Sequence, residues 1–353
     1  MGEGGARAWL PAATGAWAAC HAVMQITWAT TGAAVPWSPH VAYHPAVHLA
    51  LAAVAVAAGA AAVATTRVRS KAVLAAAAAA AAVFATGMLS LPAHVVTLLS
   101  FSGVESGAGL TQVLSSTVGV CLLVGVATRY RRRLRGRCPR CGATHPAEHT
   151  GPLVYPPPSV APARTRLLVG VLVCGVVPWA AVKTVWTLGG DALGVTAEAW
   201  RAGSAGESGV LAALGSVGVD VTVLAAAAAL VLVAGLTFRW GQVFPRWAFP
   251  VAGRRVPRLL PLLPAWLTAV GLSVYGPLLV AYAALSALGV LPAIAPAEPF
   301  PTSADTTWMV AFGGLAFGGL GSGLLVAAGS YGKRTRPTCS VSSGRAPGPR
   351  SAR

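Results

Sequence analysis

A short hydrophilic stretch of the chain holds the residues best suited to bind a metal. It reads Cys138-Pro-Arg-Cys141-Gly-Ala-Thr-His145-Pro-Ala-Glu-His149. Two cysteines separated by two residues and followed by glycine are typical of one half of a zinc knuckle, because the turn aims both thiolates at one ion. A tetrahedral site needs four ligands, and His145 and His149 are the nearest candidates for the other two. The sequence therefore predicts a structural zinc site at Cys138, Cys141, His145 and His149.

Other arrangements of this stretch stay open. The two ligand pairs are closer in sequence than in typical zinc fingers, and two loops of a dimer, each giving one cysteine pair, would also complete a site. A redox-active or simply reduced dithiol and an unstructured basic loop are the remaining alternatives. Cys138, Cys141 and Cys339 all lie on the basic side of the chain, so the cysteines indicate no extracytoplasmic disulfide framework.

Two charged side chains, Lys183 and Asp220, fall inside long apolar stretches. An ionisable group inside a membrane costs about 2.5–3.5 kcal/mol, so such residues are candidates for a functional site. Both positions lie within a few helical turns of the same membrane surface, and we expect the two side chains to pair. The pair would couple a proton or ion, or hold a polar substrate. Alternatively it fixes helix packing, or Lys183 extends to the headgroups, and the lack of further acidic partners favours packing.

Three histidines, His40, His44 and His48, recur at every fourth position. On one continuous helix this spacing would stack three imidazoles, and neutral imidazole binds zinc, copper or haem iron. Pro45 breaks that geometry, because it makes residue 44 a helix boundary. The sequence therefore favours hydrogen-bonded histidines over a metal site at these positions.

The elements that must position these residues are membrane helices. Of the 353 residues, 55% are hydrophobic and 10% are charged, whereas a soluble domain carries about 25% charged residues. A spanning helix needs about 20 largely apolar residues. We predict an all-α, polytopic membrane protein with about eight transmembrane helices, at 9–31, 45–66, 72–99, 108–128, 165–188, 209–238, 261–289 and 305–331.

Positive charge is distributed on one side of these predicted helices. All Lys and Arg residues except Lys183 and Arg201 lie between or beyond them, always on the same side. The positive-inside rule then places both termini in the cytoplasm and the protein in a bacterial cytoplasmic membrane. The net charge of +17 is spread over loops that adjoin apolar stretches, so we expect anionic lipid headgroups as partners and no nucleic acid.

The first predicted helix has one competing interpretation. Arg7 precedes an apolar run that ends in Ala18-Ala19-Cys20, a pattern also found in cleaved lipoprotein signal peptides. Trp17 occupies the position where such signals carry leucine, and Pro11 shortens the apolar core. These two residues favour a helix that is retained in the mature protein.

A long basic connection divides the chain. It is arginine-rich at first and then contains three successive prolines, whereas the last residues of the chain have almost no apolar content and are expected to be disordered. A protein partner could bind through the basic loop. The predicted parts are a first four-helix half (1–128), a cytoplasmic loop (129–164), a second four-helix half (165–332) and a disordered cytoplasmic tail (333–353).

The two halves resemble each other in sequence. The run from His21 to Gly32 aligns without gaps with the run from Trp179 to Gly190, which pairs Gln25 with Lys183 and Trp28 with Trp186. Tandem duplication of a four-helix unit would give two parallel repeats with the same orientation. Chance similarity between two helices rich in Ala, Val and Thr is the alternative.

Three segments carry a family resemblance. Trp186-Thr-Leu-Gly-Gly190, the loop from Arg239 to Trp247, and the arginine-rich run before Cys138 are similar to segments of Streptomyces-type actinobacterial multi-pass integral membrane proteins. The resemblance covers about a fifth of the chain, and the family has no assigned activity. It implies the architecture and the compartment alone.

The sequence contains no spacing typical of a nucleophile and its base, and we expect no enzyme. The pattern favours a non-enzymatic scaffold or regulatory component of the membrane. The alternative is a transporter of small solutes or ions that uses Lys183 and Asp220. A membrane enzyme that uses His40, His44 and His48 is the third and weakest hypothesis.

Overall fold

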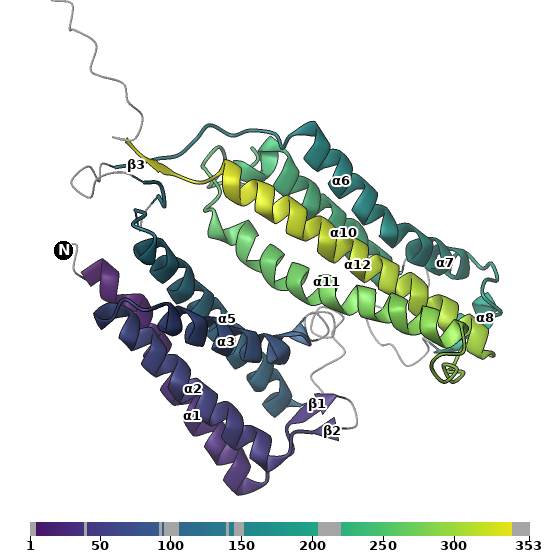
Figure 1. The fold of residues 1–353 in the computed structure, drawn as a ribbon. Helices are drawn as coiled ribbons and strands as arrows, with labels where there is room; N and C mark the ends of the chain where they lie inside the picture. Colours follow the sequence, from purple (N-terminus) through teal and green to yellow (C-terminus); the bar gives the residue numbers. More distant parts are fainter. Residues whose placement is uncertain are drawn as a thin grey trace, which may run out of the picture. The chain divides into compact units, whose positions relative to one another are not determined.

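The computed structural model describes residues 5–38, 41–91, 94, 106–138, 141–144, 152–203 and 220–340, which are mostly helical (Figure 1). The chain forms two compact units. Unit 1 comprises Met1–Val154 together with Pro337–Arg353, and unit 2 comprises Tyr155–Arg336. The chain therefore leaves unit 1 once and returns to it after its last long helix.

The described residues of unit 1 form four long helices, and the first turns of α2, α3 and α5 are capped by side chains. The Ser70 hydroxyl accepts a hydrogen bond from the Ala72 amide, and the Ser106 hydroxyl accepts one from the Gly109 amide. Such caps satisfy amide groups that have no partner within the helix. The elements are α1 (Gly5–Thr31), β1 (Pro36–Ser38), β2 (Val41–Ala42), α2 (Pro45–Arg67), α3 (Lys71–Met88), α5 (Gly107–Leu134), β3 (Leu153–Val154) and β4 (Thr338–Cys339).

Large side chains fill the centre of unit 1. Helix α1 packs against α2, α3 packs against α5, and α5 also contacts α1. The Trp17 and Phe84 rings meet edge to face with their centroids 5.0 Å apart. A Cβ atom at Gly119 would overlap the Trp17 ring, so this glycine provides the space that the indole occupies.

The described residues of unit 2 form a helix interrupted near Pro178 and four further α-helices. A short 3-10 turn precedes this proline, whose missing N–H removes one helical hydrogen bond. The elements are α6 (Ala163–Val173), η2 (Cys174–Val176), α7 (Val177–Thr187), α8 (Ala197–Gly203), α10 (Val221–Thr237), η3 (Arg239–Gln242), α11 (Leu259–Ala287) and α12 (Ser303–Arg334).

Glycines bring the helices of unit 2 into backbone contact. Helices α11 and α12 run side by side (Figure 1), and a Cβ atom at Gly276 would overlap the Gly318 backbone nitrogen. A Cβ atom at Gly175 would lie 2.5 Å from the Leu315 carbonyl oxygen, so the break between α6 and α7 sits directly against α12. This is the small-residue packing typical of helices in a membrane.

Among the described residues, six helices are long and apolar enough to cross a membrane, as in a multi-pass membrane protein. Large apolar side chains on them are exposed, among them Leu167 at 70% and Leu278 at 62%, as expected where lipid is the solvent. The six are Pro45–Arg67, Lys71–Met88, Gly107–Leu134, Ala163–Thr187, Leu259–Ala287 and Ser303–Arg334. The predicted count of eight and the orientation of the termini remain predictions.

Two predicted spans are not among the six. Helix α1 covers the predicted span 9–31 but falls outside the apolar set, and α10 covers the described part of the predicted span 209–238 with 17 residues. Residues 204–219 lie outside the described residues. So do residues 92–93 and 95–105, which include most of the last part of the predicted span 72–99. The predicted helices at 45–66, 108–128, 165–188, 261–289 and 305–331 all coincide with helices of the structure.

Hydrogen bonds join basic segments to neighbouring helix ends within each unit. In unit 1 the Tyr130 hydroxyl donates to the Val68 carbonyl at 2.8 Å and accepts from the Ser70 amide, which ties the arginine-rich end of α5 to the basic turn between α2 and α3. In unit 2 Arg334, at the end of α12, donates to the Leu236 carbonyl at the end of α10. These bonds bring together basic segments that the sequence places on the same side of the predicted helices.

The predicted boundaries need two corrections. The division between units falls after Val154, inside the predicted 129–164 loop, and α5 extends to Leu134 within that same segment. The prediction of disorder was wrong for residues 333–340, because α12 continues to Arg334 and β4 pairs with β3. A basic segment with little apolar content can be ordered when its backbone gains a strand partner. Residues 341–353 lie outside the described residues.

Candidate functional site: a three-cysteine cluster

The two cysteines after α5 lie in a tight turn. The Gly142 amide donates to the Cys138 carbonyl at 2.7 Å, and the Cys138 amide donates to the Ala143 carbonyl at 2.8 Å. Gly142 has a φ of +70°, a conformation that favours glycine. The Ala143 amide donates to the Cys141 sulfur at 3.4 Å, and such a bond stabilises a thiolate. The local sequence therefore folds into the turn predicted from Cys-Pro-Arg-Cys-Gly.

A third cysteine reaches this turn from the other end of the sequence. Strand β4 pairs with β3 so that Cys339 lies opposite Leu153, and the Ser340 amide donates to the Pro152 carbonyl at 3.1 Å. This pairing carries Cys339 to the turn, with its sulfur 4.0 Å from that of Cys138.

The three sulfur atoms are spaced for a single metal ion. They all lie within 4.8 Å of one another, and the exposed fractions of Cys138, Cys141 and Cys339 are 6%, 2% and 0%. In a tetrahedral zinc site with bonds of about 2.3 Å, neighbouring sulfurs are about 3.8 Å apart. A small inward movement of the side chains would therefore bring all three to bonding distance. The cluster is positioned to hold a metal ion.

The surroundings of the cluster are apolar. Ala143 and Leu153 pack against the three cysteines. Burial, together with hydrogen bonds to the Cys141 and Cys138 sulfurs, raises the pKa of the Cys339 thiol to about 11. Thiolate is the form that binds metal, so a bound ion would displace the proton from this group.

The structure brings together two of the four predicted metal ligands and adds a third cysteine that was not predicted. It brings Cys138 and Cys141 together, while His145 and His149 lie outside the described residues. Within the described part of the chain the cluster has three members, the third being Cys339. Its presence on the same basic side was the one signal in the sequence that could have suggested this third ligand.

Lys183 and Asp220 do form the expected pair. The Lys183 ammonium lies 3.5 Å from a carboxylate oxygen of Asp220 and donates to the Thr222 hydroxyl at 3.1 Å. Asp220 is also the N-cap of α10, since its other oxygen accepts from the Thr222 and Val223 amides. Both residues belong to unit 2, and their side chains are 12% and 13% exposed.

Aromatic rings enclose the same ammonium. It lies 5.2 Å from the centroid of Trp179 and 4.8 Å from that of Trp200, which stacks on Trp186 at 4.4 Å. An ammonium over an aromatic face is attracted to the ring quadrupole. Lys183 therefore joins α7, α8 and the start of α10, and most of its bonding capacity is used within unit 2.

The predicted histidine series is divided between different environments. His44 caps α2 by accepting a hydrogen bond from the Ala46 amide at 3.2 Å, as expected from Pro45. His48 is 1% exposed and bonds to Gln25 of α1, so it does not stack with His44 around a metal. His40 lies outside the described residues.

A chain of buried polar side chains crosses unit 1, which the sequence did not reveal as a cluster. His48 Nδ1 lies 2.6 Å from Gln25 Oε1, and Gln25 Nε2 donates to Gln112 Oε1 at 2.6 Å. The same Gln25 nitrogen lies 3.0 Å from His21 Nε2, and His21 Nδ1 lies 2.7 Å from the Ser115 hydroxyl. The chain links α1, α2 and α5, and it is hereafter called the Gln25 network.

The hydrogen-bond pattern fixes the protons of the Gln25 network. An amide oxygen can only accept, so His48 Nδ1 carries a proton, and His21 Nε2 must accept because the Gln25 nitrogen donates. Neutral His48 then has an unprotonated Nε2 atom, which is buried and has no hydrogen-bond partner. The signal available in the sequence was the i, i+4 spacing of His21 and Gln25 in an otherwise apolar helix.

Comparison of the chain with protein-family models, with characterised proteins and with solved structures finds no match.

Proposed function

We propose that the protein is a non-enzymatic scaffold or regulatory component of a membrane, in which a zinc ion fastens the tail after α12 to the loop after α5. The observation that carries this proposal is the grouping of three buried thiols from two segments 201 residues apart in sequence. Zinc suits a thiolate-rich tetrahedral site better than magnesium or calcium, which prefer oxygen ligands.

The chemistry of the cluster supports a structural metal. Catalytic zinc keeps one open position for water or substrate, whereas structural zinc is closed by protein ligands that are usually cysteines. Thiols with exposed fractions of 6% or less leave little room for a substrate. His145 or His149 would supply the fourth ligand, in keeping with the sequence prediction.

A clamp at this place would control a basic surface. Arg131, Arg132 and Arg133 form the last turn of α5, immediately before the cysteine turn. Fastening Cys339 there fixes the position of the arginine-rich tail relative to these residues. Basic segments next to membrane helices bind anionic headgroups with about 1 kcal/mol per residue. The proposed partners are therefore anionic lipids and a protein that binds the 129–164 loop.

The contacts of Lys183 favour this proposal over transport. The ammonium has a carboxylate, a hydroxyl and two aromatic faces as partners, all within unit 2. A coupling site must release its ion or proton during each cycle, and a group with this many fixed partners resists such a change. The pair is nevertheless the feature that supports the alternative function, an ion or solute transporter.

Metal analysis of the purified protein tests the zinc clamp. We expect about one zinc per chain in the wild type and none in Cys339→Ser or in the Cys138→Ser/Cys141→Ser double variant. Cys174→Ser is the matched control, because this exposed cysteine lies outside the cluster and its loss should leave the zinc content unchanged. A wild type without zinc, or a Cys339→Ser variant with full zinc content, would contradict the proposal. His145→Ala and His149→Ala then identify the fourth ligand.

Limited trypsin digestion tests whether the metal holds the tail. Cleavage after Arg334, five residues before Cys339, should accelerate when a chelator removes zinc, since strand β4 loses its anchor. Cleavage after Arg201, in α8 of unit 2, serves as the internal control and should keep its rate. Equal rates of cleavage after Arg334 with and without zinc would show that the metal does not fasten the tail.

Proteoliposomes distinguish the scaffold from the transporter. Wild-type protein reconstituted with a pH-sensitive dye inside the vesicles should give no proton flux above that of empty vesicles. A flux that Asp220→Asn abolishes would support the transporter and contradict the scaffold. Because the zinc measurement does not depend on this result, the two parts of the proposal can fail separately.

A further inference from the structure

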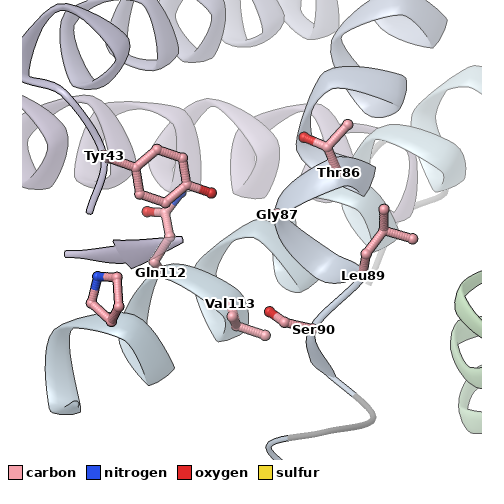
Figure 2. Close-up of a pocket in the computed structure, with 8 residues that line it drawn as sticks. Tyr43, Thr86, Gly87, Leu89, Ser90, Gln112 and Val113 are labelled. Carbon is pink, nitrogen blue, oxygen red and sulfur yellow. The ribbon is translucent and has the colours of Figure 1, made fainter. Parts of the chain in front are cut away.

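A cavity of about 210 Å³ lies in unit 1 beside the Gln25 network (Figure 2). Tyr43 and Gln112 lie on one side of it, and Thr86, Leu89 and Ser90 lie on the other. These residues come from the segment before α2, the end of α3 and the start of α5. At about 30 Å³ for each water in the liquid, the space corresponds to roughly seven water molecules.

The cavity offers hydrogen bonds of both kinds. Gln112 Oε1 already accepts a hydrogen bond from Gln25. None of the described residues accepts a hydrogen bond from the Gln112 amide nitrogen, so its N–H groups can donate to a ligand. The Thr86 hydroxyl donates to the Val83 carbonyl at 2.7 Å, so toward the cavity it can only accept. A ligand that bridges these walls needs an acceptor for Gln112 and a donor for Thr86.

The Gln25 network holds one wall of the cavity in place. Gln112 is 3% exposed and receives the Gln25 bond at 2.6 Å, and the His48 ring packs against the Tyr43 ring with centroids 5.6 Å apart. A Cβ atom at Gly87 would lie 2.7 Å from the Ser116 hydroxyl, so this glycine allows α3 to approach α5 at the cavity floor. Preorganised walls reduce the entropy lost on binding.

Two buried polar atoms in residues that contact the lining, but do not themselves line the cavity, have no hydrogen-bond partner. They are His48 Nε2 and the Ser116 hydroxyl oxygen, and both residues are 1% exposed. Buried polar groups are nearly always hydrogen-bonded, and exceptions in a structure often mark a place where water or a ligand binds. His48 contacts the ring of the lining residue Tyr43, and Ser116 faces the lining residue Gly87.

The chemistry of the lining excludes two classes of ligand. Among the described residues that line the cavity there is no Asp, Glu, Lys or Arg, so this part of the lining offers a charged ligand no compensation for its lost hydration. A pure hydrocarbon would leave the Gln112 donors unpaired. We propose that this cavity binds a small uncharged solute with both a donor and an acceptor, such as an amide or a polyol, through Gln112 and Thr86. The inference does not depend on the zinc clamp.

Saturation-transfer NMR on the full chain in detergent micelles tests the proposal. The probes are acetamide, urea and glycerol, with acetate and methylammonium as charged molecules of similar size. We expect transfer to at least one of the uncharged probes and none to the charged ones. Gln112→Leu should reduce the affinity about tenfold, the loss expected for one to two hydrogen bonds. Thr111→Leu, at the exposed neighbouring position of the same helix, is the matched control and should bind like the wild type.

A second variant is needed because Gln112 also belongs to the Gln25 network, so that Gln112→Leu could lose binding through a folding defect. Ser90→Phe fills the cavity without removing any bond of that network, and its folding is checked by an unchanged circular dichroism spectrum. Loss of transfer in both variants, with Thr111→Leu unaffected, supports the site. The proposal is overturned if no uncharged probe shows transfer, if charged probes bind equally well, or if transfer survives in both variants.

Discussion

The helices of unit 1 approach one another through side chains, whereas those of unit 2 approach backbone to backbone. In unit 1 the space above Gly119 is filled by the Trp17 ring, and the space above Gly87 by the Ser116 hydroxyl. In unit 2 the space above Gly276 is filled by the backbone of Gly318. The Gln25 network and the cavity beside it lie among the helices of unit 1 that pack through side chains in this way.

Each unit has a polar centre, formed by the Gln25 network in unit 1 and by Lys183 and Asp220 in unit 2. The two centres differ in charge, but their central residues align in sequence. Gln25 of unit 1 aligns with Lys183 of unit 2, and each contacts an aromatic ring four residues earlier, His21 and Trp179 respectively. Each also binds the first turn of the following long helix, through His48 in α2 and through Asp220 at α10. The central residue is neutral in unit 1 and charged in unit 2, and the duplication itself stays a prediction.

Exchanging the two central residues should have the largest effect. Gln25→Lys places an ammonium among neutral groups at a position that is 0% exposed, and we expect a loss of about 4 kcal/mol in the free energy of unfolding. Lys183→Gln should lose only about 1 kcal/mol, because Asp220 keeps its bonds to the start of α10. Reversible unfolding in mixed micelles, followed by circular dichroism, measures both values.

A lysine elsewhere on α1 provides the control for this exchange. Thr27→Lys lies two residues further on, at an exposed position where the side chain can extend to the membrane surface, and should change stability by less than about 1 kcal/mol. Similar losses for Gln25→Lys and Lys183→Gln would show that the two centres do not differ as the contacts indicate.

Removing the anion of the charged centre should have the next largest effect. Asp220→Ala leaves Lys183 without its carboxylate and α10 without its cap, and we expect a loss of about 3 kcal/mol. Asp220→Asn keeps the cap, so its loss should be about 1 kcal/mol smaller. In a Lys183→Met background the cost of Asp220→Asn should nearly vanish, because no unpaired charge remains. An unchanged cost in that background would mean that the two side chains are not coupled.

A methyl group tests the backbone contact of unit 2. Gly276→Ala must push α11 away from α12, and we expect a loss of about 2 kcal/mol. Gly313→Ala, in α12, is the matched control: a Cβ atom there meets nothing within 4 Å, and alanine favours the helix by up to about 1 kcal/mol. Thermal unfolding of both variants gives the comparison. Equal effects at the two positions would argue against close backbone packing.

Local patterns predicted much of the helical framework. Apolar length and the alternation of basic segments indicated the helices, and Pro45 correctly indicated the boundary at His44. Such local patterns could not predict which segments far apart in the sequence pair with each other. The tail near Cys339 has a composition typical of disorder, and only its pairing with Leu153 of β3 orders it.

The candidate sites divide in the same way. The turn at Cys138 and Cys141 is local and was predicted, whereas Cys339 lies 201 residues from Cys138. Lys183 and Asp220 were found because a charge inside an apolar stretch is conspicuous. Gln25 was missed because a neutral amide does not stand out in an apolar stretch. It nevertheless forms the centre of the network in unit 1.

The smallest expected effect concerns the aromatic contacts of cations in the two units. Trp179→Leu removes one face from the enclosed Lys183 ammonium, and we expect a loss of about 1 kcal/mol. In unit 1 Arg129 lies 5.4 Å from the ring centroid of Trp9, which is 53% exposed, and solvent weakens this attraction. Trp9→Leu should therefore lose less than about 0.5 kcal/mol.

The Lys183→Met background separates this attraction from simple loss of packing. If the ring of Trp179 stabilises the ammonium, Trp179→Leu should cost less when Lys183 is absent, while the cost of Trp9→Leu should be the same in both backgrounds. A constant cost of Trp179→Leu would assign the whole effect to apolar contact. The charged centre of unit 2 would then depend on Asp220 and Thr222 alone, and its aromatic neighbours would resemble those of the neutral centre in unit 1.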